Sequence, residues 1–276
     1  MTYDLIIGFG MACSCSQSLR KAELQFLSFP FDWVVPDNDH FEGDLPRRAD
    51  IVCAEFADWL NAEDLEYRGP HINGMDHYLN RRWGFVHLHD FPQGVPLEES
   101  LPSVAGKYRR RTARMLELIR RSRRVLVVRL DRPDRKHSTP VSDCRLARQA
   151  LMRKFPGTAF DFVLIQQDEC VRDETPEEGV RLLSFDYLNR TPGADRSQPV
   201  FSAVVNALKS RFRVRDYRTA DERRQWKRAK RLKRYAKLGA ANALQYRWRK
   251  LLSLILPPSC AARPSAPAPC TSSPDP

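Results

Sequence analysis

Two cysteines stand two positions apart in the segment Gly10 to Arg20, GMACSCSQSLR, which follows a short apolar stretch. A cysteine placed where a strand turns into a helix lies close to free backbone N–H groups and to the positive end of the helix dipole. Both lower the thiol pKa from about 8.5, and the same amides can hold an oxyanion. We therefore take Cys13 as a candidate nucleophile and expect the amides of residues 13–15 to bind the oxyanion. Alternatively, Cys13 and Cys15 are small buried residues that fill the corner between strand and helix.

A cysteine nucleophile needs a base, and two histidines lie in the alternating segment Phe85 to His89. The period of a strand places His87 and His89 on one face, so both are candidate bases. Asp90 points to the opposite face in a regular strand and can orient His89 only if the chain bends there. Asp32 is the competing candidate for orienting the imidazole.

Other combinations of these residues suggest different sites. His87 and His89 with a carboxylate could hold a metal ion, but no ligand-spacing motif supports one, and we expect none. Cys13 and Cys15 lack the spacing of a redox pair. Gly8 and Gly10 lack the third glycine of a dinucleotide fingerprint, so we expect no cofactor.

Two residues are candidates for substrate binding. Arg129 ends the strand VLVVRL, where ligands bind in an open α/β sheet, although pairing with Asp131 is the alternative. Trp33 belongs to the aromatic segment Phe29 to Trp33, which we expect to pack a loop onto the core and to form one wall of a pocket.

The elements that must position these residues alternate between apolar strands and helices. We expect strands at Tyr3–Gly8, Phe85–His89, Val125–Leu130, Phe162–Gln166 and Arg181–Phe185. We expect one helix that is capped by Ser14 or Ser16 and ends near Ala22, and another that is capped by Ser142 and ends at Lys154. Further helices are expected at Ile51–Leu60, Val104–Arg123 and Val200–Phe212. The alternation predicts an α/β fold, a mostly parallel sheet flanked by helices in three layers.

The net charge of +12 is concentrated near the end of the chain. Residues 209–250 hold 17 Lys and Arg against three acidic residues, whereas the rest of the chain is nearly neutral. We expect an α/β domain at 1–212, a basic amphipathic helical extension at 213–256 and a disordered tail at 257–276. The mixture of basic and aromatic residues at 221–256 suits an anionic membrane surface better than nucleic acid, because no nucleic-acid motif accompanies the charge.

Seven irregularly spaced cysteines argue for a reducing compartment rather than a disulfide framework. The first ten residues do not form a signal peptide, and no apolar stretch reaches about 18 residues. We therefore expect a cytoplasmic protein that is at most peripheral to the inner membrane.

Several motifs together resemble those of a bacterial family of unknown function described as papain-like cysteine peptidases. They are Gly10 and Cys13, the Leu19-Arg20 pair, the PFDW segment, HDF at residues 89–91 and KYRRR at residues 107–111. The resemblance covers residues 3–210. It implies that Cys13 is the nucleophile and favours His89, the histidine of HDF, as the base. A papain-like arrangement implies an antiparallel sheet for the histidine, whereas the apolar pattern predicts parallel order.

The sequence thus predicts a cysteine-dependent hydrolase or acyl transferase acting on a peptide, amide or ester. The alternative is a binding protein without catalysis, or one related to glycans, at the inner membrane surface beside enzymes of envelope polysaccharide synthesis. The sequence defines no oligomeric state.

Overall fold

The computed structural model describes residues 1–37, 42–71, 73–132, 138–187 and 201–232. The chain divides into two compact units, Met1–Tyr217 and Arg218–Pro276. The expected tail at 257–276 and most of the expected extension lie outside the described residues. Within the second unit, residues 220–232 form a helix.

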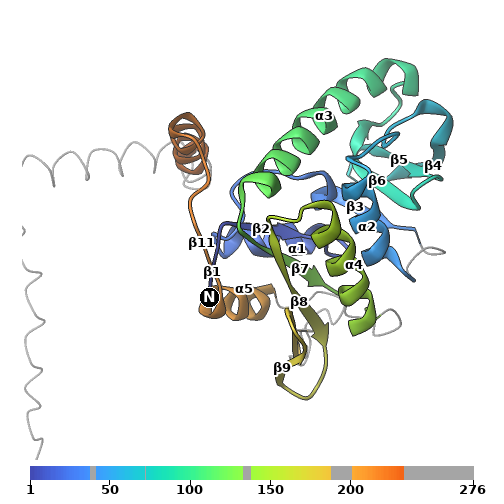
Figure 1. The fold of residues 1–276 in the computed structure, drawn as a ribbon. Coiled ribbons are helices and arrows are strands. Elements are labelled where there is room, and N and C mark those ends of the chain that lie inside the picture. The colour runs from blue at the N-terminus through green and yellow to red at the C-terminus, as the bar shows by residue number, and fades with distance from the viewer. Residues whose placement is uncertain (38–41, 72, 133–137, 188–200, 233–276) are drawn as a thin grey trace, which may run out of the picture. The chain divides into compact units, whose positions relative to one another are not determined.

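A mostly parallel sheet forms the centre of the first unit (Figure 1). Its strand order is β2-β7-β8-β10-β9, with the first four strands parallel and β9 antiparallel to β10. The bounds are β2 Leu5–Gly8, β7 Arg124–Leu130, β8 Ala159–Gln167, β9 Arg172–Glu177 and β10 Val180–Phe185. The expected α/β class and mostly parallel sheet are confirmed. A short parallel pair, β1 Thr2–Tyr3 and β11 Arg213–Val214, joins the two ends of this unit.

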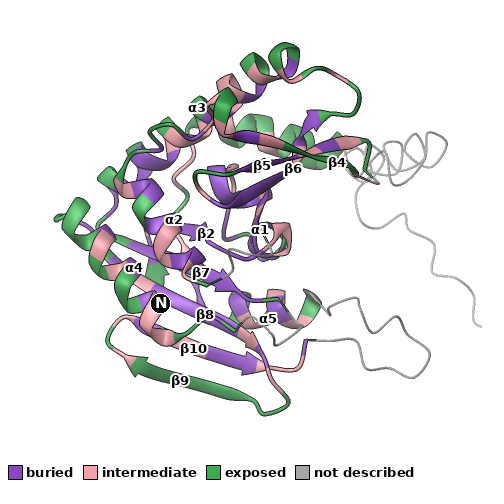
Figure 2. Ribbon diagram, turned by 90° about the vertical axis from the view of Figure 1, so that its right-hand side faces the viewer, coloured by how far each residue is buried: buried purple, intermediate pink, exposed green. Residues whose placement is uncertain are grey.

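Alternate residues of the central strands enter two separate hydrophobic clusters, because successive side chains of a strand point to opposite faces. Leu126 and Val128 of β7 pack with α1 Cys13–Lys21 and α5 Phe201–Arg211. Val125 and Val127 belong to the cluster that contains α2 Asp44–Cys53, α3 Leu97–Arg121 and α4 Val141–Lys154. Figure 2 shows these strands as the buried part of the molecule.

A second, antiparallel sheet was not predicted as such. Its strand order is β3-β6-β5-β4, with β3 Val34–Pro36, β4 Leu65–His71, β5 Met75–Asn80 and β6 Phe85–Pro92. The predicted strand Phe85–His89 is the core of β6 and lies in this sheet. The two short helices η1 Pro30–Trp33 and η3 Ala62–Asp64 precede its strands β3 and β4.

Three predictions about helices are wrong. The helix expected at Ile51–Leu60 is α2, which begins at Asp44 and ends at Cys53. The serine caps are also absent, because α1 begins after Ala12 and α4 after Pro140, each without a side-chain cap hydrogen bond.

Candidate functional site

Cys13 and Cys15 occupy different environments although both belong to the start of α1. Cys15 is buried against the sheet, and its thiol donates to the carbonyl oxygen of Val128 at 3.4 Å. Burial raises the pKa of Cys15 to about 12. A Cβ placed on Gly10 would lie 2.1 Å from the Cβ of Cys15, so glycine is required for this close approach. Cys15 is therefore a core residue that fills the corner between strand and helix.

Cys13 is the first residue of α1 and is partly exposed. Its sulfur lies 3.6 Å from Nε2 of Gln17, one helical turn later. Burial raises the pKa of the Cys13 thiol, while the backbone N–H groups of Cys13 and Ser14 act to lower it. The predicted lowering of this pKa is thus wrong, because the loss of solvation outweighs the helix terminus. The amide of Cys15 donates to the carbonyl of Ala12, so only two of the three expected amides point to the sulfur.

Asp32 holds the PFDW segment against α1 rather than orienting a histidine. The carboxylate is buried and accepts hydrogen bonds from Arg20 at 2.6 Å, from Gln25 at 2.8 Å and from the backbone of Phe29 at 3.0 Å. Ser16 adds a hydrogen bond to the carbonyl oxygen of Asp32 at 3.1 Å. These partners occupy the carboxylate, which leaves its predicted role beside an imidazole without support.

Trp33 lies between α1 and β6. The guanidinium of Arg20 stacks over the Trp33 ring at 5.5 Å, and the ring of His89 meets it edge-on at 5.4 Å. Phe29 and Phe31 are buried in the core, as expected for the aromatic residues of this segment. Trp33 thus connects the element that carries Cys13 with the strand that carries His89.

A bulge in β6 separates the two histidines that were expected to share a face. Tyr78 pairs with His87 and Asp76 with Phe91, so three residues of β6 oppose one residue of β5. His87 is fully buried, and its Nδ1 lies 3.0 Å from Oδ2 of Asp90. The irregularity that Asp90 would need to orient an imidazole is present in β6, but it brings this carboxylate to His87 and not to His89.

The carboxylate of Asp90 is the centre of a buried hydrogen-bond network. Tyr108 donates to it at 2.6 Å and Lys107 at 2.5 Å, both from α3. Burial acts to raise the pKa of Asp90, but the hydrogen bond from His87 and the charge of Lys107 hold it well below its usual range. With Asp90 ionised, Nδ1 of His87 must carry a proton. Nε2 of His87 is buried and has no hydrogen-bond partner among the described residues.

His89 lies outside this network and contacts a residue that the sequence analysis missed. Nδ1 of His89 is 3.0 Å from Nδ2 of Asn73, in the hairpin turn between β4 and β5. Burial lowers the pKa of His89, and nearby His71 lowers it further, against an opposing effect of Asp90. His89 is therefore neutral at pH 7. The Asn73-Gly74 dipeptide is a hairpin signal in the sequence, but nothing in its spacing reveals the contact with His89.

Arg129 is fully buried and is held by protein groups. Its guanidinium donates to Asp44 at 2.5 and 3.0 Å, to Asp131 at 3.0 Å and to the carbonyl oxygen of Phe9 at 2.9 Å. Arg48 is the second buried arginine bonded to Asp44. These contacts favour the alternative to substrate binding, in which Arg129 pairs with Asp131. They also show that the pair belongs to a larger buried ionic network.

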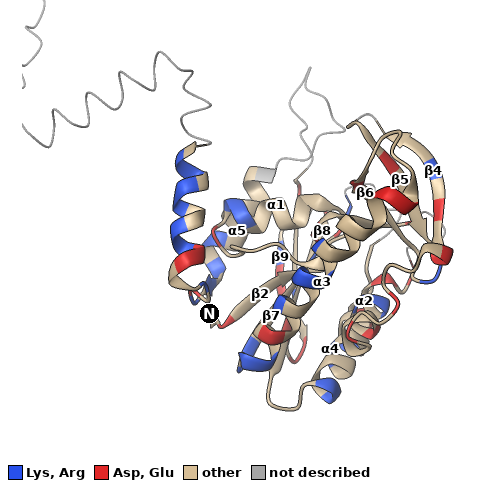
Figure 3. Cartoon of the chain, turned by 90° about the horizontal axis from the view of Figure 1, so that it is seen from above, with Lys and Arg blue, Asp and Glu red and all other residues tan. Residues whose placement is uncertain are grey.

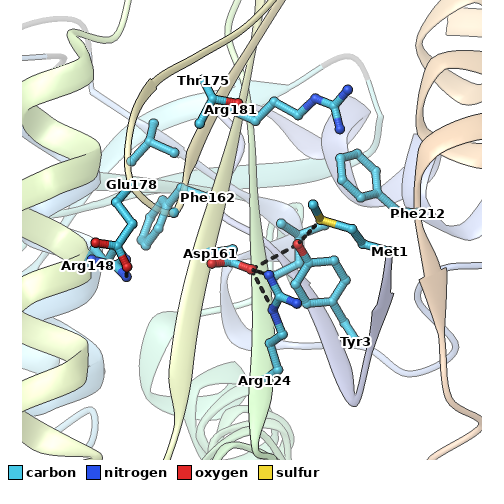
Figure 4. A pocket seen from close by; sticks show the side chains of 13 residues that line it. Met1, Tyr3, Arg124, Arg148, Asp161, Phe162, Thr175, Glu178, Arg181 and Phe212 are labelled. Atoms are coloured by element: carbon cyan, nitrogen blue, oxygen red, sulfur yellow. Dashed lines mark hydrogen bonds and ion pairs between the residues drawn. The ribbon is translucent and has the colours of Figure 1, made fainter.

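Two cavities lie away from Cys13. One, of about 490 Å³, is lined by α3 and residues 55–61, where Glu55, Phe56 and Asp58 have positive φ angles. The other, of about 220 Å³, lies where the parallel strands begin (Figure 4). Its charges pair with one another, since Asp161 accepts from both Tyr3 and Arg124. Neither cavity includes Cys13 or His89.

Among the described residues, no group of three or more metal-ligating side chains is placed to hold a metal ion. No helix in that part of the chain is long and apolar enough to cross a membrane. Comparisons with models of protein families, with curated proteins and with solved structures found no match for this chain. The functional interpretation therefore depends on the site itself and on the sequence motifs.

Proposed function

We propose that the protein is a cysteine-dependent hydrolase or acyl transferase, of the kind that papain-like peptidases represent. The observation that carries the proposal is the position of the Cys13 thiol. It is partly exposed at the N-terminus of α1, where the backbone N–H groups of Cys13 and Ser14 are directed at its sulfur. An acyl group attacked by this sulfur would place its oxygen near the same two donors. The proposed scaffold is a three-layer α/β domain.

In the proposed reaction, Cys13 attacks the acyl carbon and its thiol proton passes to His89. The oxyanion that forms is stabilised by the amides of Cys13 and Ser14. When the intermediate collapses, the leaving group takes a proton from His89, and water or another nucleophile later cleaves the thioester. Because the pKa of the thiol is raised and that of His89 is lowered, the resting state is a neutral thiol and a neutral imidazole. The proton is therefore transferred during the attack, as in general-base catalysis.

Contacts between the motif residues support the assignment to one site region. Arg20, which follows Cys13 on α1, bonds Asp32 of PFDW, and Trp33 of the same segment contacts His89. Asp90 of HDF bonds Lys107 and Tyr108 of KYRRR. Among the described residues, no hydrogen bond joins Cys13 to a histidine. The proposal thus requires a ring nitrogen of His89 to approach the Cys13 sulfur when a substrate is bound.

The experiment is a hydrolysis screen over esters, thioesters, amides and peptides with the full chain. Cys13→Ala should abolish any activity found, because it removes the nucleophile. Cys170→Ala is the matched control, since Cys170 is exposed and lies in the loop between β8 and β9. Equal loss in both variants, or activity that survives in Cys13→Ala, would refute the proposal.

A second candidate function is peripheral binding to an anionic membrane surface by a cytoplasmic protein. The observation that favours it is the helix at 220–232, which carries six Lys and Arg against two acidic residues. In Figure 3 the Lys and Arg residues of this helix are blue. Trp226 lies between Arg218 and Lys230, at 4.7 and 4.6 Å from its ring, so aromatic and basic groups are combined. Such a combination suits the boundary between water and lipid headgroups.

A further inference from the structure

The side chain of Asn73 has an orientation that its backbone partners determine. Its Nδ2 donates to the carbonyl oxygen of Leu88 at 2.9 Å, and its Oδ1 accepts from the backbone N–H of Met75 at 3.1 Å. Turning the amide over would place oxygen against oxygen and nitrogen against a donor at these two contacts. The group that faces His89 is therefore the N–H₂ group.

This orientation determines which nitrogen of His89 can carry a proton. Nδ2 of Asn73 lies 3.0 Å from Nδ1 of His89, and a donor at this distance requires a lone pair on Nδ1. The proton of the neutral ring is then on Nε2. His87, two residues earlier, has the opposite arrangement, because Asp90 accepts from its Nδ1.

We propose that Asn73 is a positioning residue that holds the neutral His89 ring with its proton on Nε2 and covers the lone pair of Nδ1. In terms of the proposed function, on which this consequence rests, the resting tautomer cannot take the proton of Cys13. Uptake at Nδ1 requires that the hydrogen bond from Asn73 breaks. Uptake at Nε2 requires that the ring proton first moves to Nδ1, which also breaks this bond. Asn73 thus keeps His89 from acting as a base until the hairpin turn or the imidazole moves.

The titratable groups around His89 come from three strands of its sheet. They are His71 of β4, His77 of β5 and Asp90 of β6 itself. His71 accepts the backbone N–H of Asn73 through its Nδ1 at 3.3 Å, so the turn also contacts a second imidazole. Only Asn73 donates to Nδ1 of His89 among the described residues. Its substitution by Ala removes this contact together with the bonds to Leu88 and Met75.

The experiment is measurement of the ring nitrogen signals of the histidines by ¹⁵N–¹H NMR in the full chain over a pH titration. In the wild type at alkaline pH, where the His89 ring is neutral, we expect its single proton on Nε2 and none on Nδ1. We expect His87 to be protonated on Nδ1. Asn73→Asp replaces the donor with an acceptor and should move the His89 proton to Nδ1 and raise its pKa by about 1. Asn73→Ala should give a mixture of both tautomers.

Two controls distinguish a specific effect of Asn73 on the His89 tautomer from a general loss of structure. Asn61→Ala removes a partly buried amide that bonds Asp64 and should leave the His89 signals unchanged. An unchanged His87 signal in the Asn73 variants shows that the sheet is intact. A proton on Nδ1 of His89 in the wild type, or the same tautomer in wild type and Asn73→Ala, would overturn the proposal. Because this readout does not involve Cys13, it stands or fails independently of hydrolase activity.

Discussion

At the scale of single residues, solvation decides the chemistry of the two neighbouring cysteines. Cys15 donates to a strand carbonyl inside the core, whereas Cys13 is partly exposed and has two amides near its sulfur. The helix terminus favours the thiolate by an amount that is modest compared with the cost of removing a charge from water. Cys13 is therefore a protonated thiol at neutral pH, and its reactivity depends on a proton acceptor.

The raised pKa of Cys13 leads to a first prediction. We expect the rate of Cys13 alkylation by iodoacetamide to rise with pH around a midpoint above about 8.5, the ordinary thiol value. Peptide mapping by mass spectrometry after timed labelling gives the rate for Cys13 separately from that for Cys170. A midpoint below 8.5 would show that the helix terminus outweighs burial.

Asp90 leads to a second prediction, on stability in acid. Its pKa is lowered in the folded protein, so its contribution is present above the unfolded value of about 3.9 and is lost as pH falls further. The free energy of unfolding of the wild type should therefore decrease below about pH 4. Asp90→Asn should be less stable at pH 7 and should lose part of this acid dependence. Urea denaturation at several pH values measures the free energy of unfolding of both proteins. If this free energy depends on pH with the same slope in the wild type and in Asp90→Asn, the lowered pKa of Asp90 is contradicted.

At the scale of elements, the apolar pattern of the sequence was sufficient to predict the buried strands. It was insufficient where tertiary contacts determine the structure. The apolar segments of β2, β7, β8 and β10 were predicted because strands of a parallel sheet are buried on both faces. The strands β4 and β5 were missed because polar residues interrupt both segments, and because only Leu65 of β4 is buried. The bulge in β6 was also hidden, since it depends on pairing with β5 and not on the local sequence.

The shift of α2 has a similar cause. Phe56 and Trp59 are spaced as in a helix, but the chain leaves α2 at Ala54 and passes through the left-handed residues Glu55 and Phe56. Both aromatic rings still reach the core, where they contact Phe31. Aromatic residues that are buried from a turn can thus have the same spacing in the sequence as the buried face of a helix. The candidate site shows the same limit, because Cys13 and His89 were proposed from residue type and motif, whereas Asn73 depends on a contact between hairpin and strand.

A third prediction concerns the packing of α1 on β2. Gly10→Ala should destabilise the protein by about 1–3 kcal/mol, because the added methyl group would overlap Cys15. Gly157→Ala is the matched control, since no atom lies within 4 Å of a Cβ at that position. Urea denaturation compares the two variants. Equal stability of both would mean that α1 does not approach Gly10 as closely as the structure has it.

At the scale of the whole molecule, the net positive charge is concentrated in the second unit, and the candidate site lies in the first. Residues 218–276 hold 14 Lys and Arg against three acidic residues, whereas the first unit holds 32 Lys and Arg against 31 acidic residues. The residues of the proposed membrane contact and those of the proposed reaction thus belong to different units. The two proposals can therefore be tested by separate substitutions.

The fourth prediction tests membrane attraction in the full chain. Replacing Arg223, Arg224, Lys227 and Arg228 with Gln should lower sedimentation with anionic phosphatidylserine vesicles by more than about tenfold, at about 1 kcal/mol per basic residue. The matched control replaces four exposed arginines of α3, which are Arg109, Arg110, Arg120 and Arg121. Binding that is unchanged by the first set, or lowered equally by both, would refute the assignment.

The central claim is that the Cys13 sulfur accepts an acyl group, and trapping of that intermediate tests it most directly. The full chain is incubated with a p-nitrophenyl ester and analysed by intact-protein and peptide mass spectrometry. We expect one acyl group on Cys13, its absence in Cys13→Ala and its retention in Cys170→Ala. Acylation of exposed Cys170 alone, or no acyl group on any cysteine across a panel of esters, would contradict it.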